Sequence, residues 1–482
     1  MLHEASVPGS DDWWLVRLCN RLGEGLPRLG KLRSYRDGDA LLPDAPLGAD
    51  TRSILQFMKR SRLHVVETIR DSHTDRQGVI GFRTAAAGDE IGDQAAWSVW
   101  RGNRMGTQQR SFFNDTADFG RSYIAVAPNP DGIPVWGVKN EWTTITEQDE
   151  LRPWLTRAGI SVGYDYIAGV ETVILYRAGE GGGESYWRVA IRRTSIPTLP
   201  TDGSPWSSGN DWEWASPPQY TGNGIQDALL VQNRTPDGFG LWEKHLDTVD
   251  RINEITLNAL TLIVMQSYRQ RAISGDLPEY YPEGHPQAGE PVNYEEMFKA
   301  GPAALWMLPD GAKMWESGAT DVRPIYDARR EEVKTLSSIT RTPQDIFDGQ
   351  SNNQSALGAQ VSREPLYFSV NGMNGQAAEA FAQAQALSFA LTGDSVRADS
   401  SQVETIFQKI VPPTLAEQAE AAPKFKAGGA SQRFIDAEVF AMTPQEQRRV
   451  AAERADDAFE AALSQPVTVP QRASVAVNDA GQ

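Results

Sequence analysis

Cysteine is almost absent from this chain of 482 residues, which contains only Cys19. A single cysteine excludes a disulfide bond within the chain and any zinc site built from cysteines, and it fits a reducing compartment. The five histidines include no His-Glu-x-x-His motif, and only His64 and His73 lie near each other in the sequence. We therefore expect an inert buried thiol, no metal site and no cofactor.

Long hydrophobic runs and an excess of basic residues are also missing. No apolar run approaches the roughly 20 residues that a membrane-spanning helix needs, and the N-terminus lacks a basic region followed by an apolar one. The chain has 46 Lys and Arg against 63 Asp and Glu, a formal charge of −17. This balance argues against tight nucleic-acid binding, since neutralising phosphates requires surplus cations, but it permits DNA to slide past. These features indicate a soluble cytoplasmic protein.

Catalytic motifs are incomplete or absent. Residues 25–31 match the first seven positions of a phosphate-binding loop, but Leu32 replaces the Ser or Thr that binds magnesium, and a helical pattern precedes the motif where a strand is required. The sequence contains no Gly-x-Ser-x-Gly elbow, no Gly-x-Gly-x-x-Gly after a strand and no evident triad signature. We therefore assign no catalytic residue. A pair of carboxylates acting in hydrolysis stays open, since acidic residues are plentiful.

The first half of the chain combines helical and β-rich patterns. Hydrophobic spacing predicts helices over 11–32, about 50–70 and about 93–114, and short β-rich runs from residue 78 to 193. Residues 170–176 and 185–191 read as two strands of a hairpin joined by a Gly-rich loop. The mixture predicts an α+β fold.

Three tryptophans lie close together in the Pro- and Gly-rich stretch 194–227: Trp206, Trp212 and Trp214. Such residues usually pin an irregular loop to a core, and a binding patch is the alternative.

The strongest helical pattern, over 239–273, carries one apolar stripe. Its charged residues, among them Glu243, Asp247 and Glu254, share the other side. We expect five residues of the stripe to pack in the interior: Trp242, Leu246, Val249, Ile252 and Ile255.

A polar insertion interrupts the helical patterns of the second half. Residues 324–341 and 355–391 both read as helix, the second kinked by Pro365, and Thr342-Pro343 followed by a Gly- and Asn-rich run separates them. Before them, the Pro-rich stretch 274–323 reads as a small module with a strand at 304–308. After them, 403–465 reads as helical, with helices starting at Pro412-Pro413 and Thr443-Pro444, and 466–482 as disordered.

The order of these pieces resembles the portal proteins of tailed bacteriophages, particularly those of phages that infect Gram-positive and actinobacterial hosts. The resemblance covers about residues 30–395. Its specificity comes from the order of short strings along the chain, namely Tyr35-Arg-Asp-Gly-Asp39, Trp100–Met105, Asp118–Ile124, Lys299–Trp306, Ser338–Pro343 and Asn353–Ala356.

The resemblance implies a ring, typically of twelve subunits, at one vertex of the capsid, assembled in the host cytoplasm, through which double-stranded DNA passes during packaging and ejection. It implies contacts with the large terminase subunit, a head-completion or adaptor protein, and major capsid and scaffolding proteins. The implied parts are an N-terminal helical arm (1–59), a β-rich wing (60–238), stem helices (239–273 and 324–341), a small α/β clip (274–323), a tunnel loop (342–356), a long kinked wing helix (357–402), a helical crown (403–465) and a tail (466–482).

In this scheme the tunnel loop lines the DNA channel with short polar side chains: Asp345, Asp348, Gln350, Asn352 and Asn353. Apart from Arg341 at its base, the loop has no cation that could hold a phosphate. Its sequence alone favours a solvated surface loop, and only its position in the portal scheme favours the channel. Two alternatives to a non-enzymatic portal protein are a phage-encoded hydrolase that uses paired carboxylates and another structural protein of the capsid or tail.

Overall fold

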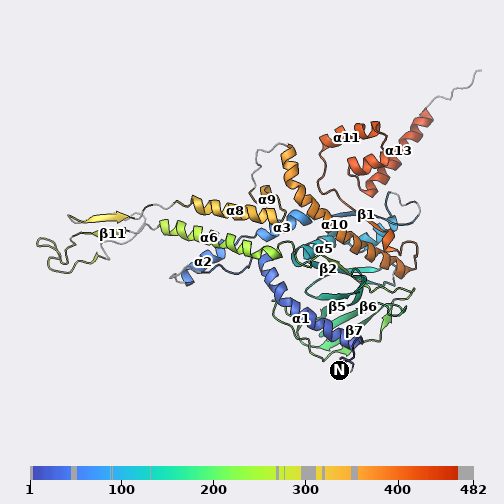
Figure 1. Cartoon of the computed structure of the whole chain (residues 1–482), viewed down its shortest axis with the longest axis horizontal. Coiled ribbons are helices and arrows are strands. Elements are labelled where there is room, and N and C mark those ends of the chain that lie inside the picture. The colour runs from blue at the N-terminus through green and yellow to red at the C-terminus, as the bar shows by residue number, and fades with distance from the viewer. Residues whose placement is uncertain are drawn as a thin grey trace, which may run out of the picture. The chain divides into compact units, whose positions relative to one another are not determined.

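The computed structural model describes residues 4–44, 51–86, 88, 91–130, 132–267, 271–275, 277–294, 311–316, 318, 321–348 and 356–464 (Figure 1). The chain forms two compact units. The first comprises residues 1–37, 65–244 and 338–482, and the second comprises 38–64 and 245–337. The second unit is thus inserted twice into the sequence of the first.

The first unit mixes helices with antiparallel strands, which confirms the α+β class. Its helices are α1 (Asp11–Arg36), α3 (Val65–Thr74), α4 (Gln94–Gly102), α5 (Met105–Phe119), α9 (Gln344–Asp348), α10 (Ala356–Thr392), α11 (Leu415–Ala427), α12 (Gln432–Phe434) and α13 (Pro444–Ser464), with short turns η2 (Ser400–Gln402) and η3 (Ile435–Val439). Its strands are β1 (Val79–Arg83), β2 (Arg121–Ala127), β3 (Val135–Asn140), β4 (Thr144–Gln148), β5 (Thr156–Asp165), β6 (Val170–Arg177), β7 (Tyr186–Arg193), β8 (Glu213–Trp214), β9 (Gln219–Tyr220), β10 (Leu230–Arg234) and β13 (Glu404–Phe407).

Three antiparallel sheets organise these strands. The largest has the order β4-β5-β6-β7-β8, with β9 also paired to β7, the second has the order β10-β2-β3, and β1 pairs with β13. Strands β6 and β7 pair in register from Val170 opposite Arg193 to Arg177 opposite Tyr186, which confirms the predicted hairpin.

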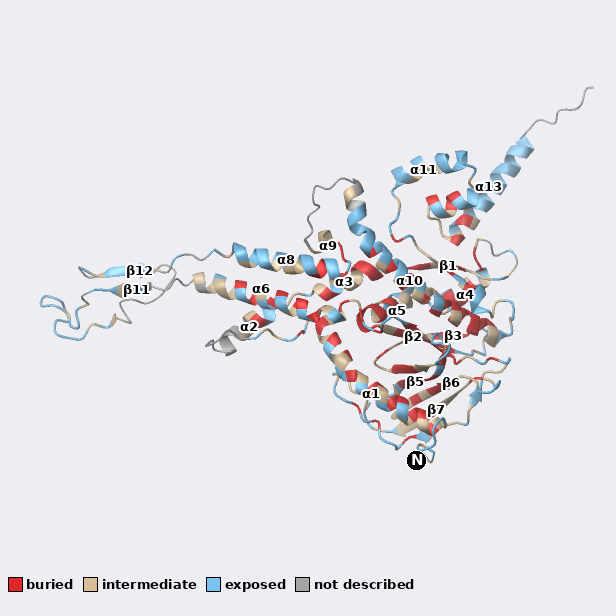
Figure 2. Cartoon of the chain, in the orientation of Figure 1, coloured by how far each residue is buried: buried red, intermediate tan, exposed pale blue. Residues whose placement is uncertain are grey.

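The main hydrophobic core lies among α4, α5, α10 and the sheet of β2, β3 and β10, where Figure 2 shows concentrated buried residues. Phe381 of α10 is fully buried, and its ring centroid lies 5.0 Å from Trp100 and 4.8 Å from Phe112. Aromatic rings at these separations bury large apolar areas and favour edge-to-face contacts. The core therefore joins residues that are almost 300 positions apart in the sequence.

Helix α1 confirms the N-terminal prediction and runs one turn beyond residue 32. The hydroxyl of Ser10 caps it by accepting a hydrogen bond from the Trp13 amide at 3.1 Å. Gly30 fits here because a Cβ at this position would lie 2.7 Å from Gly203 Cα. The stretch 25–31 is therefore helical rather than a phosphate-binding loop. One face is buried through Trp14, Leu15, Leu18, Leu22, Leu26 and Leu29.

The three clustered tryptophans attach the irregular loop to the rest of the first unit. Trp206 and Trp212 are buried, and the indole of Trp214 donates a hydrogen bond to Asp12 at 2.7 Å. The loop is thereby fixed against α1, and the binding-patch alternative has no free indole face at Trp212, which is fully buried.

The second unit consists of α2 (Thr51–Ser61), α6 (Leu246–Ser267), most of α8 (Arg323–Ile339) and the antiparallel pair β11 (Arg271–Ser274) and β12 (Lys313–Glu316). Leu257 of α6 packs with Met58 of α2, and the side-chain carbonyl of Asn253 accepts a hydrogen bond from the Leu63 amide at 2.9 Å. Arg251 of α6 forms an ion pair with Glu332 of α8 at 2.9 Å. None of the helices in the described part of the chain is long and apolar enough to span a membrane.

Several predicted boundaries were wrong. The helix expected over 93–114 is two helices, since the chain turns at Arg104, which has a φ of 53°. The helix expected over 50–70 divides into α2 and α3. The region 403–465 is not wholly helical, because β13 pairs with β1. The strand expected at 304–308 lies outside the described residues.

The long helix expected over 239–273 begins only at Leu246, after a 3-10 turn η1 (Glu243–His245), and β11 occupies Arg271–Ser274. Close packing explains why the helix does not begin at residue 239. A Cβ at Gly240 would lie 2.2 Å from the carbonyl oxygen of Asp118, and the Leu241 amide donates to the carbonyl of Ala117 at 2.7 Å. This segment is therefore held against the end of α5 and cannot join the helix. At the other end, pairing with β12 replaces the last predicted turns.

Candidate functional site

The predicted channel loop begins as a short helix. Asp345 lies in α9 and Asp348 is its last residue, which corrects the prediction of a loop over 342–356. Pro343 precedes this helix and its carbonyl accepts from the Ile346 amide at 3.1 Å, a role that suits proline at a helix start. Gln350, Asn352 and Asn353 lie outside the described residues.

A cation that sequence reasoning missed lies beside this loop. Arg363 of α10 forms an ion pair with Asp345 at 2.8 Å, and both side chains are partly exposed at 51% and 34%. Exposed pairs of this kind contribute at most about 1 kcal/mol. Nothing local marks Arg363, which follows Asp345 by 18 positions. The predicted channel loop therefore carries a neutralised acidic group at its start.

The predicted stem residues divide into three groups. Leu246, Val249 and Ile252 are buried on one face of α6, whereas Ile255 is only partly buried. Trp242 is fully buried but precedes the helix, and its indole donates to Asp118 at 3.1 Å. Trp242 thus anchors the first unit and is not part of the helical stripe.

Arg28 of α1 holds the segment just before α6. Its guanidinium pairs with Glu243 at 2.6 Å and with Glu141 at 3.4 Å, and it donates to the carbonyl of Phe119 at 2.8 Å. Glu243 is therefore an internal ion-pair partner that precedes α6, which corrects its predicted place on the charged side of the helix.

Two carboxyl groups near the same junction have raised pKa values. Burial, with a smaller contribution from the charge of Asp118, raises the pKa of Asp115 to about 7. Burial raises the pKa of Asp118 to about 6, opposed by Arg70 and by the hydrogen bond from Trp242. A raised carboxyl pKa is a property of some catalytic acids, but structural burial produces it too. Here Asp118 is fixed by Trp242 and Arg70, which favours the structural explanation.

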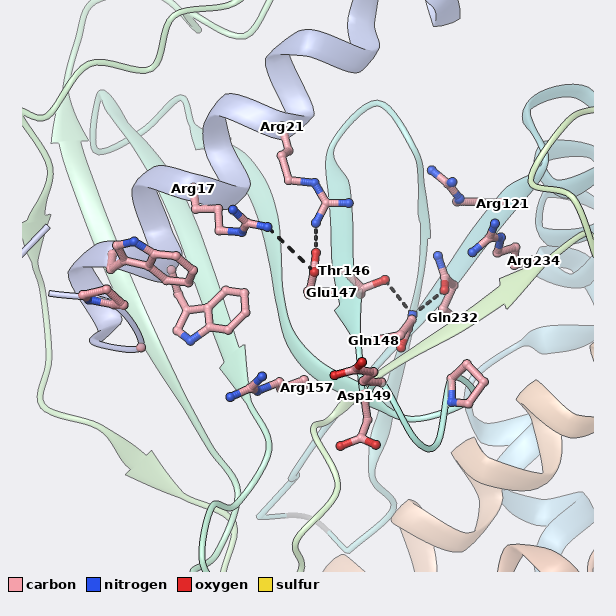
Figure 3. A pocket seen from close by; sticks show the side chains of 16 residues that line it. Arg17, Arg21, Arg121, Thr146, Glu147, Gln148, Asp149, Arg157, Gln232 and Arg234 are labelled. Atoms are coloured by element: carbon pink, nitrogen blue, oxygen red, sulfur yellow. Dashed lines mark hydrogen bonds and ion pairs between the residues drawn. The ribbon is translucent and has the colours of Figure 1, made fainter. Parts of the chain in front are cut away.

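A cavity of about 730 Å³ lies between α1, β2, β4, β10 and the loop before β5 (Figure 3). Figure 3 shows Arg17 and Arg21 extending from α1 toward Glu147, and Arg121 and Arg234 on the other side, near Gln232. Its volume lies within the usual range of about 300–1,000 Å³ for small-molecule pockets. The lining is Pro8, Gly9, Trp13, Trp14, Arg17, Arg21, Arg121, Thr146, Glu147, Gln148, Asp149, Glu150, Pro153, Arg157, Gln232 and Arg234.

The cavity concentrates positive charge in an acidic chain. Its lining holds five arginines against three carboxylates, a balance of +2. Arg121 and Arg234 lie directly opposite each other on β2 and β10, and like charges in that position repel. Burial, together with the charges of Arg17 and Arg121, lowers the pKa of Arg21. These arginines therefore favour an anionic group.

Part of the polar lining is already paired. Arg17 and Arg21 both pair with Glu147, the first at 3.9 Å. Arg121 pairs with Glu141 at 2.7 Å and Arg157 with Glu180 at 3.8 Å, two carboxylates outside the lining. The amide of Gln148 donates to Gln232 and to Thr146. Within the described part of the chain, Arg121 Nε and Gln148 Oε1 are buried without a hydrogen-bond partner. The described lining contains no histidine, cysteine or serine that could act as a nucleophile or its base. It does contain three carboxylates, Glu147, Asp149 and Glu150.

The described residues contain no group of three or more His, Cys, Asp or Glu side chains that could hold a metal ion. Cys19 is fully buried, and burial raises the pKa of its thiol to about 12.

No model of a known protein family matches the chain. The portal protein of Mycobacterium phage D29 is 25% identical over 397 residues, which cover 78% of this chain and 74% of that protein. The portal protein of Mycobacterium phage L5 is 24% identical over 398 residues, covering 79% and 74% respectively. These matches confirm the resemblance to portal proteins of actinobacterial phages.

Three solved structures are similar in part of their arrangement. The neck of an empty GTA particle is 12% identical with a TM-score of 0.42 and covers 84% of this chain and 95% of that chain. The neck of a native GTA particle is 14% identical with a TM-score of 0.40, over 85% and 98%. An HK97-family phage portal protein from Corynebacterium diphtheriae is 10% identical with a TM-score of 0.31, over 71% and 92%.

Proposed function

We propose that this chain, which resembles the portal proteins of mycobacteriophages, is itself a portal protein. It forms a ring, in our proposal of twelve subunits, at one capsid vertex, through which double-stranded DNA enters and leaves. The observation that carries the proposal is the match to two portal proteins over 78% and 79% of the chain, across both compact units. In this role the protein is a non-enzymatic part of the virion that is assembled in the host cytoplasm.

The parts of the chain take their roles by position. Residues 60–238 form the wing, α6 and α8 the stem, 274–323 the clip and 342–356 the tunnel loop. The segment 357–402, with most of the long helix α10, is part of the wing, and 403–465 is the crown. The pattern on α6 supports this assignment, because buried Val249 and Ile252 lie on one side while Asp247, Glu254 and Asn258 are exposed. A ring closes through heterologous contacts, in which one surface of a subunit meets a different surface of the next subunit.

Charge suits a conduit through which DNA slides. Twelve copies at −17 carry about −200 formal charges, which weakens phosphate binding where they face the axis. The start of the tunnel loop carries Asp345, whose charge is balanced by Arg363. The other partners are the large terminase subunit, a head-completion or adaptor protein, and the major capsid and scaffolding proteins.

Imaging and sedimentation of the purified protein test the ring. Negative-stain images should show closed rings, and sedimentation should give a mass near 640 kDa for twelve subunits of 53.0 kDa. A monomer or small oligomer that hydrolyses a substrate would instead support the paired-carboxylate alternative. If variants that no longer form rings still package DNA normally, the protein would instead be another structural protein of the capsid or tail.

Charge reversal tests the tunnel loop. Asp345→Lys with Asp348→Lys should leave rings intact and slow packaging or ejection in a salt-dependent manner, because cations would hold passing phosphates. The matched control is Asp202→Lys with Glu213→Lys, an equal charge change at exposed wing positions. Genome length per particle and ejection rate at low and high salt are measured. Wild-type values in the loop variant would show that the loop does not face moving DNA.

The ion pair at the loop provides a further control. Asp345→Lys alone places two cations beside each other, whereas Asp345→Lys with Arg363→Glu restores an opposite-charge pair. If the double variant recovers normal packaging, the defect came from the broken pair. If the defect persists, the lysine acts on the DNA.

Deletion tests the clip. Removing about residues 280–300 should leave a folded ring that cannot dock the packaging motor, because this module lies between the strands β11 and β12. Normal packaging by the deletion variant would contradict the assignment.

A further inference from the structure

The turn between β5 and β6 presents an exposed apolar tip. Tyr166 is 80% exposed and Ile167 is fully exposed. The tip is nevertheless fixed, because the Asp165 carboxylate accepts hydrogen bonds from the amides of Ile167 at 2.8 Å and Ala168 at 3.0 Å. The ring of Tyr164 lies 4.7 Å from that of Tyr166, and its hydroxyl donates to the carbonyl of Thr194 at 2.9 Å. A rigid apolar projection loses little conformational entropy when it binds.

The arginine-lined cavity lies near the opposite end of the same strand. Arg157, the second residue of β5, lines the cavity, whereas the tip directly follows Asp165, the last residue. At about 3.3 Å per residue, the ten residues of β5 separate the two features by roughly 30 Å. One subunit cannot insert its tip into its own cavity.

Exposed apolar residues neighbour one segment of the cavity lining in the sequence. Leu151 and Trp154 flank the lining residue Pro153 and are 88% and 65% exposed. Tryptophan, tyrosine and arginine are enriched among binding hot spots. The cavity thus combines aromatic surface with a charge of +2, and the tip combines Tyr166 and Ile167 with the carboxylate of Asp165.

We infer that the tip of one subunit inserts into the arginine-lined cavity of the next, in a head-to-tail contact that repeats around the ring. The occupant is a second copy of this chain, since the two surfaces differ, are complementary in charge, and lie at opposite ends of one strand. Such a heterologous contact propagates from subunit to subunit. The inference rests on the proposed ring and identifies one of its contacts.

Cysteine cross-linking of assembled protein tests the contact. The variant Ile167→Cys with Pro153→Cys places one thiol on the tip and one at the cavity, while native Cys19 is fully buried and stays unreactive. Mild oxidation should give a ladder of covalent dimers, trimers and larger species. Each single variant should give no more than dimers, and Ile167→Cys with the exposed control Val396→Cys should do the same.

The outcomes separate this inference from the proposed function. Rings by electron microscopy without a ladder would overturn the inference and leave the portal proposal intact. Dimers as the largest product of the double variant would indicate a two-fold exchange of tips and would also overturn it. If the unaltered protein forms no rings, both the portal proposal and the inferred contact are wrong.

Substitution of the exposed tip supplies a second measurement that does not depend on oxidation. Tyr166→Ser with Ile167→Ser should weaken self-association about tenfold or more, as loss of a hot spot does, without lowering the melting temperature of the subunit. The matched control, Ile196→Ser, changes an isoleucine that is 67% exposed and should assemble as the unaltered chain does. Unchanged association of the tip variant would refute the contact.

Discussion

The core around Phe381 and the helix α8 differ in how far their side chains are buried by the rest of the chain. In the core, rings from α4, α5 and α10 surround a side chain with no exposure. Along α8, only Leu336 and Ser337 are buried out of 17 residues, and Tyr326 is 38% exposed (Figure 2). Both Phe381 and Tyr326 lie on helices, but only Phe381 is covered by the rest of the chain.

This difference teaches where stability resides. The first unit buries a continuous apolar core and has its stability within a single chain. The second unit depends on α2 against α6 and on polar contacts such as the ion pair between Arg251 and Glu332. The exposed side chains of α8 are available for contacts with neighbouring subunits, which agrees with the proposed ring.

The largest expected effect comes from emptying the core. Phe381→Ala should lower the free energy of unfolding by about 3–5 kcal/mol, because a buried ring is replaced by a cavity. Tyr326→Ala on α8 should change it by less than about 0.5 kcal/mol. Denaturant unfolding of the monomer measures both, and equal losses would show that α8 is covered within the subunit.

A charge on the covered side of α6 should have the next largest effect. Val249→Asp would bury an unpaired carboxylate and should cost about 2–4 kcal/mol or prevent folding. Ile255→Asp should cost less, because Ile255 is only partly buried, and Asn258→Asp on the exposed side should be nearly neutral. If all three variants unfold alike, α6 has no buried face.

The pH dependence of the first unit should reflect Asp115, which is partly buried, and Asp118, which is buried. The folded-state pKa values of Asp115 and Asp118, about 7 and about 6, lie above the ordinary value of 3.8. The folded chain therefore binds these protons more tightly than the unfolded chain. Their stabilising contribution is fully present below about pH 4 and is lost as pH rises through 6 to 7.

Substitution of the acid isolates this effect. Asp115→Asn should remove most of a fall on the order of 1–2 kcal/mol between pH 5 and pH 8. Asp456→Asn, at an exposed position of α13, serves as the control and should leave the slope unchanged. Thermal unfolding across this pH range is the measurement, and an unchanged slope in the Asp115 variant would contradict the assignment.

The smallest expected effect lies at an exposed helix end. The hydroxyl of Thr414 accepts from the Glu417 amide at 3.3 Å, and the Glu417 carboxylate accepts from the Thr414 amide at 2.8 Å, which forms a capping box. Thr414→Ala should cost about 0.5–2 kcal/mol locally. Amide hydrogen exchange should quicken across α11 and stay unchanged in the core, and global acceleration would show that α11 is coupled to it.

Local patterns in the sequence predicted local structure well. The spacing of Leu15, Leu18 and Leu22 predicted α1, and the two β-rich runs around a Gly-rich loop predicted the hairpin of β6 and β7. Both depend on contacts between neighbours in the sequence, which periodicity reports. The long helix after the polar insertion was also expected, and α10 spans Ala356–Thr392.

Contacts between distant segments could not be predicted in this way. Pairing of β1 with β13, the anchoring of Trp242 by Asp118 and the ion pair between Asp345 and Arg363 leave no periodic signal. The arginine-lined cavity likewise draws its residues from α1, β2, β4 and β10. The portal resemblance came from the order of short strings, and it identified neither the cavity nor the exposed tip.

The pairing of β1 with β13 has a consequence for synthesis on the ribosome. Val79 is opposite Phe407, so β1 waits for more than 300 further residues before its partner strand exists. At about 5–20 residues per second, that delay is roughly 15 to 65 s. During this time Phe381 has not yet reached Trp100 and Phe112, and their apolar surfaces remain available to chaperones or to other nascent chains. Translation speed, as well as sequence, should therefore influence how much of this protein reaches its native state.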